Sequence, residues 1–359
     1  MQRNKNGQVT IAQVAREAGV STQTVSRVIN NRQEISPETR QRVQAIIDKM
    51  RYQPNAIARS LSQRRSHTLG VAVSGIEYYG PSHTLIGIDQ AANRLGFSII
   101  LSLIHQPEDG DIEQVFHNLI SRQVEGIIWA VPEIGNNRAW LRREVQRHAT
   151  PFIFTDMQSD KKFNTISVDN YLGGRLATEH LLSGGYRKIG LITGPQNWLS
   201  AQERRRGWQD ALTAAGCPHD ACQIAGGAWT AESGENGLLK LMETFPEMEA
   251  VFVSNDQMAF GVYQALWRLG KHIPEDLAVV GFDDIPESAY FCPPLTTVRQ
   301  DLYEVGNLAV QAFVNVREAE QSGNLTLEAQ NLVLQPQLII RQSSIVASNE
   351  RSKSSKNGS

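Results

Sequence analysis

The sequence predicts two parts: a small all-α helix-turn-helix headpiece with a hinge helix, then two α/β doubly wound lobes. Three observations predict this division. Apolar residues recur at helical spacing between residues 10 and 50, and β-branched runs alternate with amphipathic stretches from His67 onward. Residues 1–65 hold 12 Lys and Arg against 4 Asp and Glu, whereas the whole chain of 359 residues has a net charge of −2. A basic head therefore precedes an acidic body.

Two short helices hinged on a glycine open the headpiece. Thr10 is a good N-cap, and Gly19 stands where a helix ends in a left-handed residue. Ser21 then caps a second helix, which would bury Val25 and Val28. The polar face that this helix leaves outside consists of Thr22, Gln23, Ser26 and Arg27.

A third helix is predicted behind Ser36, with Pro37 at its first position. Its apolar stripe consists of Val43, Ile46, Ile47 and Met50. Three helices around one small core, with a polar helix face outside, are typical of proteins that lay the second helix in the DNA major groove. Periodicity alone leaves a generic three-helix bundle as an equal alternative. The basic charge favours a polyanionic partner for the head.

The composition narrows the class of the protein. Its length and a hydrophobic content of 41% allow a sizeable core and more than one domain. No apolar run approaches ~18 residues and the polar N-terminus lacks a signal-peptide core, so we expect a soluble, cytoplasmic protein without a membrane partner. The three cysteines form no metal-ligand spacing and suit a reducing compartment: Cys217, Cys222 and Cys292. No metal or cofactor is expected.

Buried parallel strands are predicted in two successive sets, each with helices between the strands. The first set has strands at 68–73, 98–103, 126–129 and 152–155 and helices at 85–95 and 112–122. The second has strands at 188–193, 250–253 and 278–282 and helices at 173–182, 204–215 and 258–269. Two such units indicate two lobes with a cleft between them, where ligands bind beyond the carboxyl ends of the strands.

Polar residues stand where this cleft is expected. Asp156, Asn255 and Asp283 each follow a predicted strand, Arg204 begins a helix, and Trp229 is isolated in a Gly-rich stretch. A carboxylate, a guanidinium and a carboxamide that converge can satisfy pairs of vicinal hydroxyls, and an indole covers the apolar face of a pyranose. Together these residues predict a saccharide site. For any one of them alone, a helix N-cap or a loop salt bridge is the stronger interpretation.

The run from Val14 to Asn30, Val-Ala-x-x-Ala-Gly-Val-Ser-x-x-Thr-Val-Ser-Arg-Val-Ile-Asn, resembles the headpiece signature of the lac-repressor family of bacterial transcription regulators. The resemblance implies that Thr22, Gln23 and Arg27 read base edges, since Gln suits adenine and Arg suits guanine. It implies that phosphates are held mostly by Ser21, Thr24, Asn30 and Thr39. The family's namesake has tyrosine at the position of Thr22, so we expect the operator to differ at that base pair.

Residues 53–66 are predicted to form a hinge helix. Its roughly eight helical residues fall below the ~12–15 that a helix needs to hold alone, which makes it a natural switch element. In the resembling family this helix pairs with its twin in the minor groove and inserts a leucine between base steps. That role falls to Leu61 here, with Asn55 as the cap, and both are expected to contact DNA. Ordinary helix packing is the alternative for Leu61.

The resemblance also divides the chain into a headpiece (1–52), the hinge (53–66), a two-lobed effector-binding and dimerisation domain (67–342) and a tail. The two-lobed part is similar to the periplasmic sugar-binding fold. It implies lobe one at 67–168 and 300–329 and lobe two at 169–299 and 330–342, with the last crossing before a strand at 332–340. The tail, 343–359, has no leucine heptad and is predicted to be disordered. The family's namesake ends in a leucine-repeat helix that makes tetramers, so the lack of this repeat implies a homodimer here.

Further runs resemble the family's namesake more than its purine- or ribose-sensing branches. They are Ser200-Ala201-x-x-Arg204-x-x-Gly207-Trp208, Asn255-Asp256-Gln257-Met258-Ala259-x-Gly261, Val280-Gly281-x-Asp283-Asp284 and Pro293-Pro294-Leu295-Thr296-Thr297. They imply a pocket in which Trp229 stacks on the sugar ring and the sugar hydroxyls are hydrogen-bonded by Asp156, Arg204, Asn255 and Asp283. The aglycone side would be lined by Tyr78, Gly80, Pro81 and Thr84. Ala130 replaces an asparagine and Leu302 a pocket phenylalanine, so the galactoside core is expected to be retained and the aglycone contact altered.

The sequence thus predicts a dimeric repressor of a sugar-utilisation operon, associated with the nucleoid when bound. It would leave its double-stranded operator DNA on binding a small saccharide, specifically a β-galactoside. A transport-type sugar-binding protein and a regulator with a different effector as corepressor are the alternatives. An enzyme could use Asp256 with Asp283 and Asp284 as paired carboxylates, but the sequence has no phosphate loop, HExxH, nucleophile elbow or zinc spacing, and no catalytic residue is expected.

Overall fold

The computed structural model describes residues 9–29, 34–52, 66–105, 111–134, 137–159, 161–323 and 329–345. The chain divides into two compact units, Met1–His67 and Thr68–Ser359. Four of the predictions lie outside the described residues: those for Asn30, Asn55, Leu61 and the hinge helix. The described helices include none that is long and apolar enough to cross a membrane.

The headpiece has the predicted helices α1 (Ile11–Glu17), α2 (Thr22–Ile29) and α3 (Pro37–Met50). Each begins at the expected cap, because a hydroxyl oxygen accepts a backbone N–H of the first turn: Thr10 from Gln13, Ser21 from Thr24, and Ser36 from Thr39. Gly19 ends the first helix with φ +63°. A small core joins the three helices through Val14, Ala15, Ala18, Val25, Val28, Val43 and Ile47.

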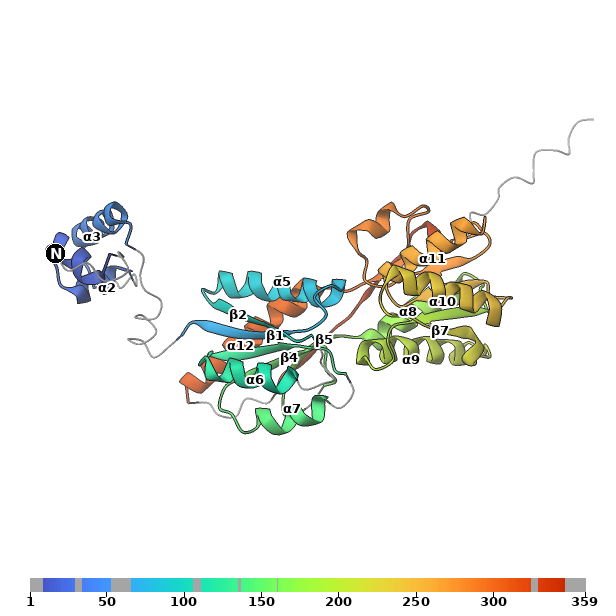
Figure 1. Cartoon of the computed structure of the whole chain (residues 1–359), viewed down its shortest axis with the longest axis horizontal. Helices are drawn as coiled ribbons and strands as arrows, with labels where there is room; N and C mark the ends of the chain where they lie inside the picture. Colours follow the sequence, from blue (N-terminus) through green and yellow to red (C-terminus); the bar gives the residue numbers. More distant parts are fainter. Residues whose placement is uncertain are drawn as a thin grey trace, which may run out of the picture. The chain divides into compact units, whose positions relative to one another are not determined.

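The first α/β lobe is built on a sheet in the order β11-β5-β4-β3-β1-β2, all parallel. Its strands are β1 (Thr68–Val73), β2 (Ser98–Leu103), β3 (Gly126–Ala130), β4 (Phe152–Thr155), β5 (Asn164–Val168) and β11 (Asn331–Leu334). The helices are α5 (Tyr79–Arg94), α6 (Asp111–Ser121), α7 (Asn137–Val145) and α12 (Leu302–Gln321). Residues of α5 and α12 pack on one face of the sheet and those of α6 and α7 on the other (Figure 1). Alternation of side chains along the strands supplies both cores, since Ile128 faces the first and Trp129 the second.

The second lobe repeats this plan on a parallel sheet in the order β7-β6-β8-β9. Its strands are β6 (Ile189–Thr193), β7 (Ile224–Gly226), β8 (Ala250–Val253) and β9 (Ala278–Val280). Helices α8 (Asn170–Ser183) and α9 (Leu199–Ala214) cover one face, and α10 (Ala231–Thr244) and α11 (Asp256–Arg268) cover the other. A separate antiparallel pair joins β10 (Thr297–Arg299) to β12 (Gln337–Ile339). The doubly wound fold predicted from the sequence is confirmed for both lobes.

Three expectations are corrected by the structure. The single last strand is two strands, and β11 pairs with β5 in the first lobe's sheet, so residues 331–334 do not belong to lobe two. The chain crosses between lobes after β11, at Pro336, which has no N–H to extend a ladder. The strand at 98–103 is an edge strand rather than a buried one, because only β1 pairs with it.

The third correction concerns the predicted disordered tail, whose first residues are ordered. Ser343 and Ser344 are buried within the short 3-10 helix Gln342–Ser344. The Ser343 hydroxyl donates to the Val279 carbonyl oxygen at 2.6 Å, and the Ser344 hydroxyl lies 2.7 Å from Nε2 of His180. These buried bonds order the segment, since a buried hydroxyl group needs a partner.

Helices in each lobe meet at glycine pairs where the two backbones touch. A Cβ atom on Gly207 of α9 would lie 2.2 Å from a carbonyl oxygen of α8, and one on Gly174 of α8 would lie 2.2 Å from the Arg204 carbonyl oxygen of α9. Only glycine allows so close an approach. Two other helix pairs repeat the device, with Gly87 and Gly306 between α5 and α12 and with Gly234 and Gly261 between α10 and α11.

Candidate functional site

A cavity of about 770 Å³, counting its open mouth, lies between the two lobes at the carboxyl ends of the strands. It is lined by residues of both lobes, as expected for doubly wound sheets. The sequence-predicted residues that line it are Tyr78, Gly80, Pro81, Thr84, Ala130, Asp156, Arg204, Trp229, Asn255, Asp283 and Leu302. The structure therefore brings the whole predicted effector set to one place.

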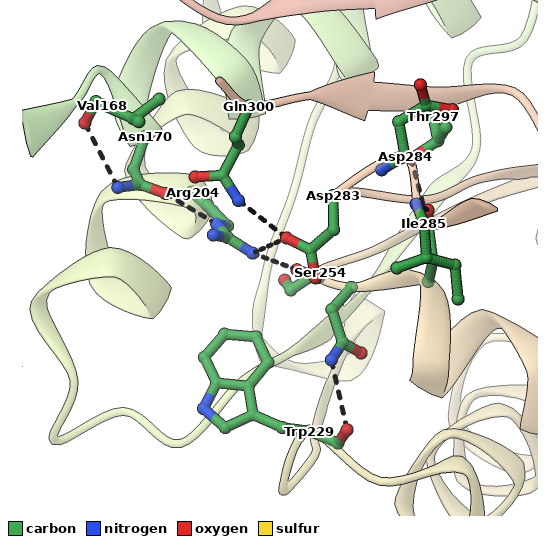
Figure 2. A network of polar contacts seen from close by, with 12 residues as sticks. Val168, Asn170, Arg204, Trp229, Ser254, Asp283, Asp284, Ile285, Thr297 and Gln300 are labelled. Atoms are coloured by element: carbon green, nitrogen blue, oxygen red, sulfur yellow. Dashed lines mark hydrogen bonds and ion pairs between the residues drawn. The ribbon is translucent and has the colours of Figure 1, made fainter. Parts of the chain in front are cut away.

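Arg204, near the start of α9, is the best anchored of these side chains. It is 6% exposed, and its Nε donates to Oδ1 of Asn170 at 2.8 Å while Nη1 donates to the Ser254 carbonyl oxygen at 2.5 Å (Figure 2). Its guanidinium carbon stands 3.6 Å from the ring centre of Phe282 and 5.5 Å from that of Trp229. Two charged hydrogen bonds and two rings leave this cation a single orientation in the cavity wall.

Two carboxylates accompany this guanidinium. Asp283 Oδ1 lies 3.7 Å from Arg204 Nη1 and accepts a 2.7 Å hydrogen bond from Gln300 Nε2 (Figure 2). Burial raises the pKa of Asp283 to about 6, and the charge of Arg204 and the Gln300 bond offset only part of that effect. Burial also raises the pKa of Asp156, at the end of β4, to about 6, with Arg204 acting in the opposite sense. Both groups are mostly ionised at neutral pH and accept hydrogen bonds.

Asn255 and Trp229 are joined by a hydrogen bond. Asn255 caps α11 by accepting the Met258 N–H at 2.8 Å, and its amide Nδ2 donates to the Trp229 carbonyl oxygen at 3.1 Å. Trp229 adopts φ +65°, and Asp156 and Asp283 also have positive φ, at 56° and 115°. Non-glycine residues rarely adopt such angles, and those that do cluster at functional sites.

Asp256 lies outside the cavity lining. Its carboxylate accepts hydrogen bonds from the hydroxyls of Ser288 and Thr297, both at 2.7 Å, and from the Ile285 N–H at 3.1 Å. Burial and then the neighbouring Asp283 raise the pKa of Asp256 to about 7. This carboxylate therefore holds the loop after β9 in place, where the sequence left an acid/base role open.

Some residues of the cavity wall were not predicted from the sequence, namely Tyr79, Pro132, Asn170, Trp198 and Gln300. Trp198 is the largest of them and stands at the N-cap position of α9. Its place after the strand 188–193 was a usable signal, because that loop ends at the carboxyl edge of the sheet. Asn170 and Gln300 flank the lobe crossings and act on Arg204 and Asp283.

The second candidate site is the outer face of α2 in the headpiece. Thr22, Gln23 and Arg27 are exposed, as predicted for base-reading groups. Arg27 Nη1 lies 3.5 Å from a carboxylate oxygen of Glu34, with both side chains largely in solvent. Among the residues expected to hold phosphates, the hydroxyl of Ser21 lies 3.0 Å from that of Thr24 and the hydroxyl of Ser36 donates to that of Thr39.

Comparison with known proteins finds a family match for each of the two parts that hold these sites. Residues 10–55 match the model of bacterial regulatory proteins of the lacI family, and residues 178–344 match a periplasmic binding protein-like domain. The lactose operon repressor of Escherichia coli (strain K12) is 32% identical over 312 residues, which cover 87% of this chain and 86% of that protein. The chain belongs to the lacI family.

Other relatives of this lacI-family protein also match it over nearly its whole length. The ribose operon repressor of Escherichia coli (strain K12) is 33% identical over 337 residues, covering 92% of this chain and 98% of that protein. The structure is similar to that of the lac repressor dimer bound to operator and the anti-inducer ONPF, with a TM-score of 0.82 at 32% identity over 94% of this chain and 100% of that one. The lacI-family protein is therefore a DNA-binding transcription regulator and not an enzyme.

Proposed function

We propose that this lacI-family regulator is a repressor that binds its operator as a homodimer and leaves it when a small saccharide, a β-galactoside, occupies the cavity. The observation that carries the proposal is the cavity itself, which places two carboxylates, a guanidinium and an indole around one space between the lobes. The exposed polar face of α2 supplies the DNA-binding surface.

The cavity chemistry suits a pyranose. Asp156 and Asp283 accept hydrogen bonds from sugar hydroxyls, and Arg204 between them donates to hydroxyl oxygens. The indole of Trp229 offers an apolar face to the C–H face of the ring. Arg204 needs no reorganisation to bind, since its own protein bonds hold it in place.

The headpiece chemistry suits base-edge recognition by α2. Gln23 matches the N6 and N7 edge of adenine, and Arg27 matches O6 and N7 of guanine. In the free headpiece Arg27 pairs with Glu34, an exposed ion pair worth at most about 1 kcal/mol, so a guanine displaces Glu34 at little cost. Two headpieces on a two-fold dimer predict a pseudo-palindromic operator.

Ligand binding couples to DNA through the lobes. The cavity takes Asp156 from lobe one and Arg204 from lobe two, so a bound sugar favours one arrangement of the lobes over another. The effector acts through its different affinity for the two arrangements.

The test has two stages. Selection of DNA from a random library by the purified protein identifies the operator, and fluorescence anisotropy then measures its affinity with and without each sugar. A melting-temperature screen ranks galactosides against glucosides and pentoses, because a ligand that binds only the folded protein stabilises it. Galactosides are expected to raise the melting temperature and weaken operator binding. A sugar that tightens operator binding would identify a corepressor instead, and affinity unchanged by every saccharide would refute the proposed function.

A further inference from the structure

Asp284 follows Asp283 in the loop after β9, but its carboxylate meets two arginines and the described lining of the cavity does not include it. Its Oδ2 lies 2.6 Å from Nε of Arg299, and its Oδ1 lies 2.7 Å from Nη2 of Arg341. The Asp284 side chain is 6% exposed. Since each oxygen of this buried carboxylate has its own charged donor, the side chain has one fixed orientation.

The two arginines belong to segments through which the chain crosses between the lobes. Arg299 is the last residue of β10, which packs in lobe two, and the chain enters α12 of lobe one at Leu302. Arg341 follows β12, the strand that begins after the crossing at Pro336 and pairs with β10. Asp284 therefore ties both crossing segments to the loop after β9 at a single point.

The same loop carries Asp283, which lines the cavity beside Arg204. The Asp283 N–H donates to the Val298 carbonyl oxygen of β10 at 2.8 Å. Its carboxylate accepts a hydrogen bond from Gln300, the residue directly after β10 (Figure 2). A sugar hydroxyl that binds Asp283 therefore acts on a residue bonded to a crossing segment through both its backbone and its side chain.

The backbone of this loop needs support from its surroundings. Asp283 and Asp284 are consecutive non-glycine residues at positive φ, 115° and 54°. Such a conformation persists only where neighbouring groups impose it. The Asp284 N–H donates to the Thr297 hydroxyl at 3.3 Å, and the two arginines hold its carboxylate. These contacts keep the loop shape in which Asp283 points at Arg204.

A purely structural role for Asp284 is the alternative, and two observations weigh against it. Asp256 already anchors the loop to lobe two through the Ser288 and Thr297 hydroxyls and the Ile285 N–H. The Arg299 side chain is 52% exposed, and ion pairs of exposed arginines contribute little to stability. Contact with the crossing segments is what the arginines add.

We propose that Asp284, Arg299 and Arg341 form a coupling clamp, which transmits sugar occupancy at Asp283 to the crossing segments and so to the arrangement of the lobes. The inference rests on the proposed function, since it assumes that Asp283 binds the sugar and that the lobe arrangement governs operator affinity. Asp284 is a positioning residue, because it acts through Asp283. With the coupling clamp loosened, Asp283 can bind sugar without moving the crossing segments, and the operator is retained.

The experiment measures coupling on the full chain as the ratio of operator dissociation constants with and without saturating methyl β-galactoside. Fluorescence anisotropy gives the operator affinities, and calorimetry without DNA confirms saturation. The variants are Asp284→Asn, which keeps the side-chain shape, and Arg299→Gln, which is expected to melt within about 2 °C of the wild type. Arg206→Gln is the matched control, because it removes the same charge from an ion-paired lobe-two arginine that is 57% exposed.

Arg206→Gln is expected to keep the wild-type ratio, whereas Arg299→Gln and Asp284→Asn should lower it to about a third or less. Operator affinity without sugar should stay within about twofold, and Arg299→Lys, which can still donate to Asp284, should recover most of the ratio. If Asp284→Asn melts well below the wild type, Arg299→Gln decides the question.

An unchanged ratio in Arg299→Gln overturns the inference and leaves the proposed function intact, and so does an equal fall in Arg206→Gln. A wild type whose operator affinity does not respond to methyl β-galactoside overturns both.

Discussion

Replacement of Arg204 by lysine tests the centre of the cavity, because it keeps the charge and removes the planar fork. The two bonds of Arg204 to Asn170 Oδ1 and the Ser254 carbonyl oxygen come from two separate nitrogens, Nε and Nη1, whereas lysine has one nitrogen and no planar group to stack on Phe282. One charged hydrogen bond is worth about 1.5–3 kcal/mol, so we expect a loss of that size in unfolding free energy. Arg204→Ala leaves Asp283 buried without its cation and should cost about 3–5 kcal/mol.

Urea unfolding followed by circular dichroism measures the loss, and the melting temperature should fall by about 3–12 °C for Arg204→Lys. Galactoside affinity should fall about tenfold to a hundredfold in the same variant, while operator affinity without sugar stays close to that of the wild type. Arg206→Lys, at a side chain 57% exposed on the same helix, is the control and should change none of these values. The reasoning is wrong if Arg204→Lys is destabilised yet binds and responds to the sugar normally, since Arg204 would then serve only lobe two.

Three other predictions follow from the sites. Galactoside affinity should fall when the pH drops from 7.5 to 5, because the pKa values of Asp156 and Asp283, about 6, leave both carboxyls mostly protonated at the lower pH. The expected loss is about tenfold for each of the two carboxylates that the sugar needs in ionised form. Calorimetry that shows equal affinity at both pH values contradicts this. Gly207→Ala should lower the free energy of unfolding by about 1–3 kcal/mol, because the added methyl group forces α8 and α9 apart, and it should weaken sugar binding. Gly226 has open space around it, so Gly226→Ala should change neither value in the same unfolding and titration assays. Arg27→Ala should relax base choice at one operator position at a cost of about 1–3 kcal/mol in anisotropy titrations, and an equal weakening on random DNA would reduce Arg27 to a phosphate contact.

Much of the fold was accessible from the sequence because local signals and tertiary structure agree. The caps Thr10, Ser21 and Ser36 begin helices where the pattern predicted them, and the strand at 68–73 is found with the same bounds. The order of the strands in each sheet was harder to predict from the sequence. The apolar run at 98–103 predicts burial, but its position at the sheet edge depends on pairing that no local pattern encodes.

The residues of the cavity were likewise predicted only in part. Asp156, Asn255 and Asp283 were found because parallel strands bring their carboxyl ends together, although Asn255 also has the N-cap role that was its single-residue interpretation. Asp256, its neighbour in sequence, turns away into the loop after β9. Trp198 was missed although it follows the strand at 188–193, because an aromatic residue before a helix does not by itself indicate a ligand site. One of its two ring contacts, the one with Tyr78, also comes from the opposite lobe.

The glycine pairs at the three helix crossings have a consequence for tolerance to change. Where backbones touch directly, no layer of side chains can adjust, so an added methyl group must move a whole helix. A saturation library selected for repression should show its deepest intolerance at these six glycines, even though none of them reads a base. Any redesign of the effector range would therefore proceed by altering the residues of the cavity wall while leaving this rigid scaffold untouched.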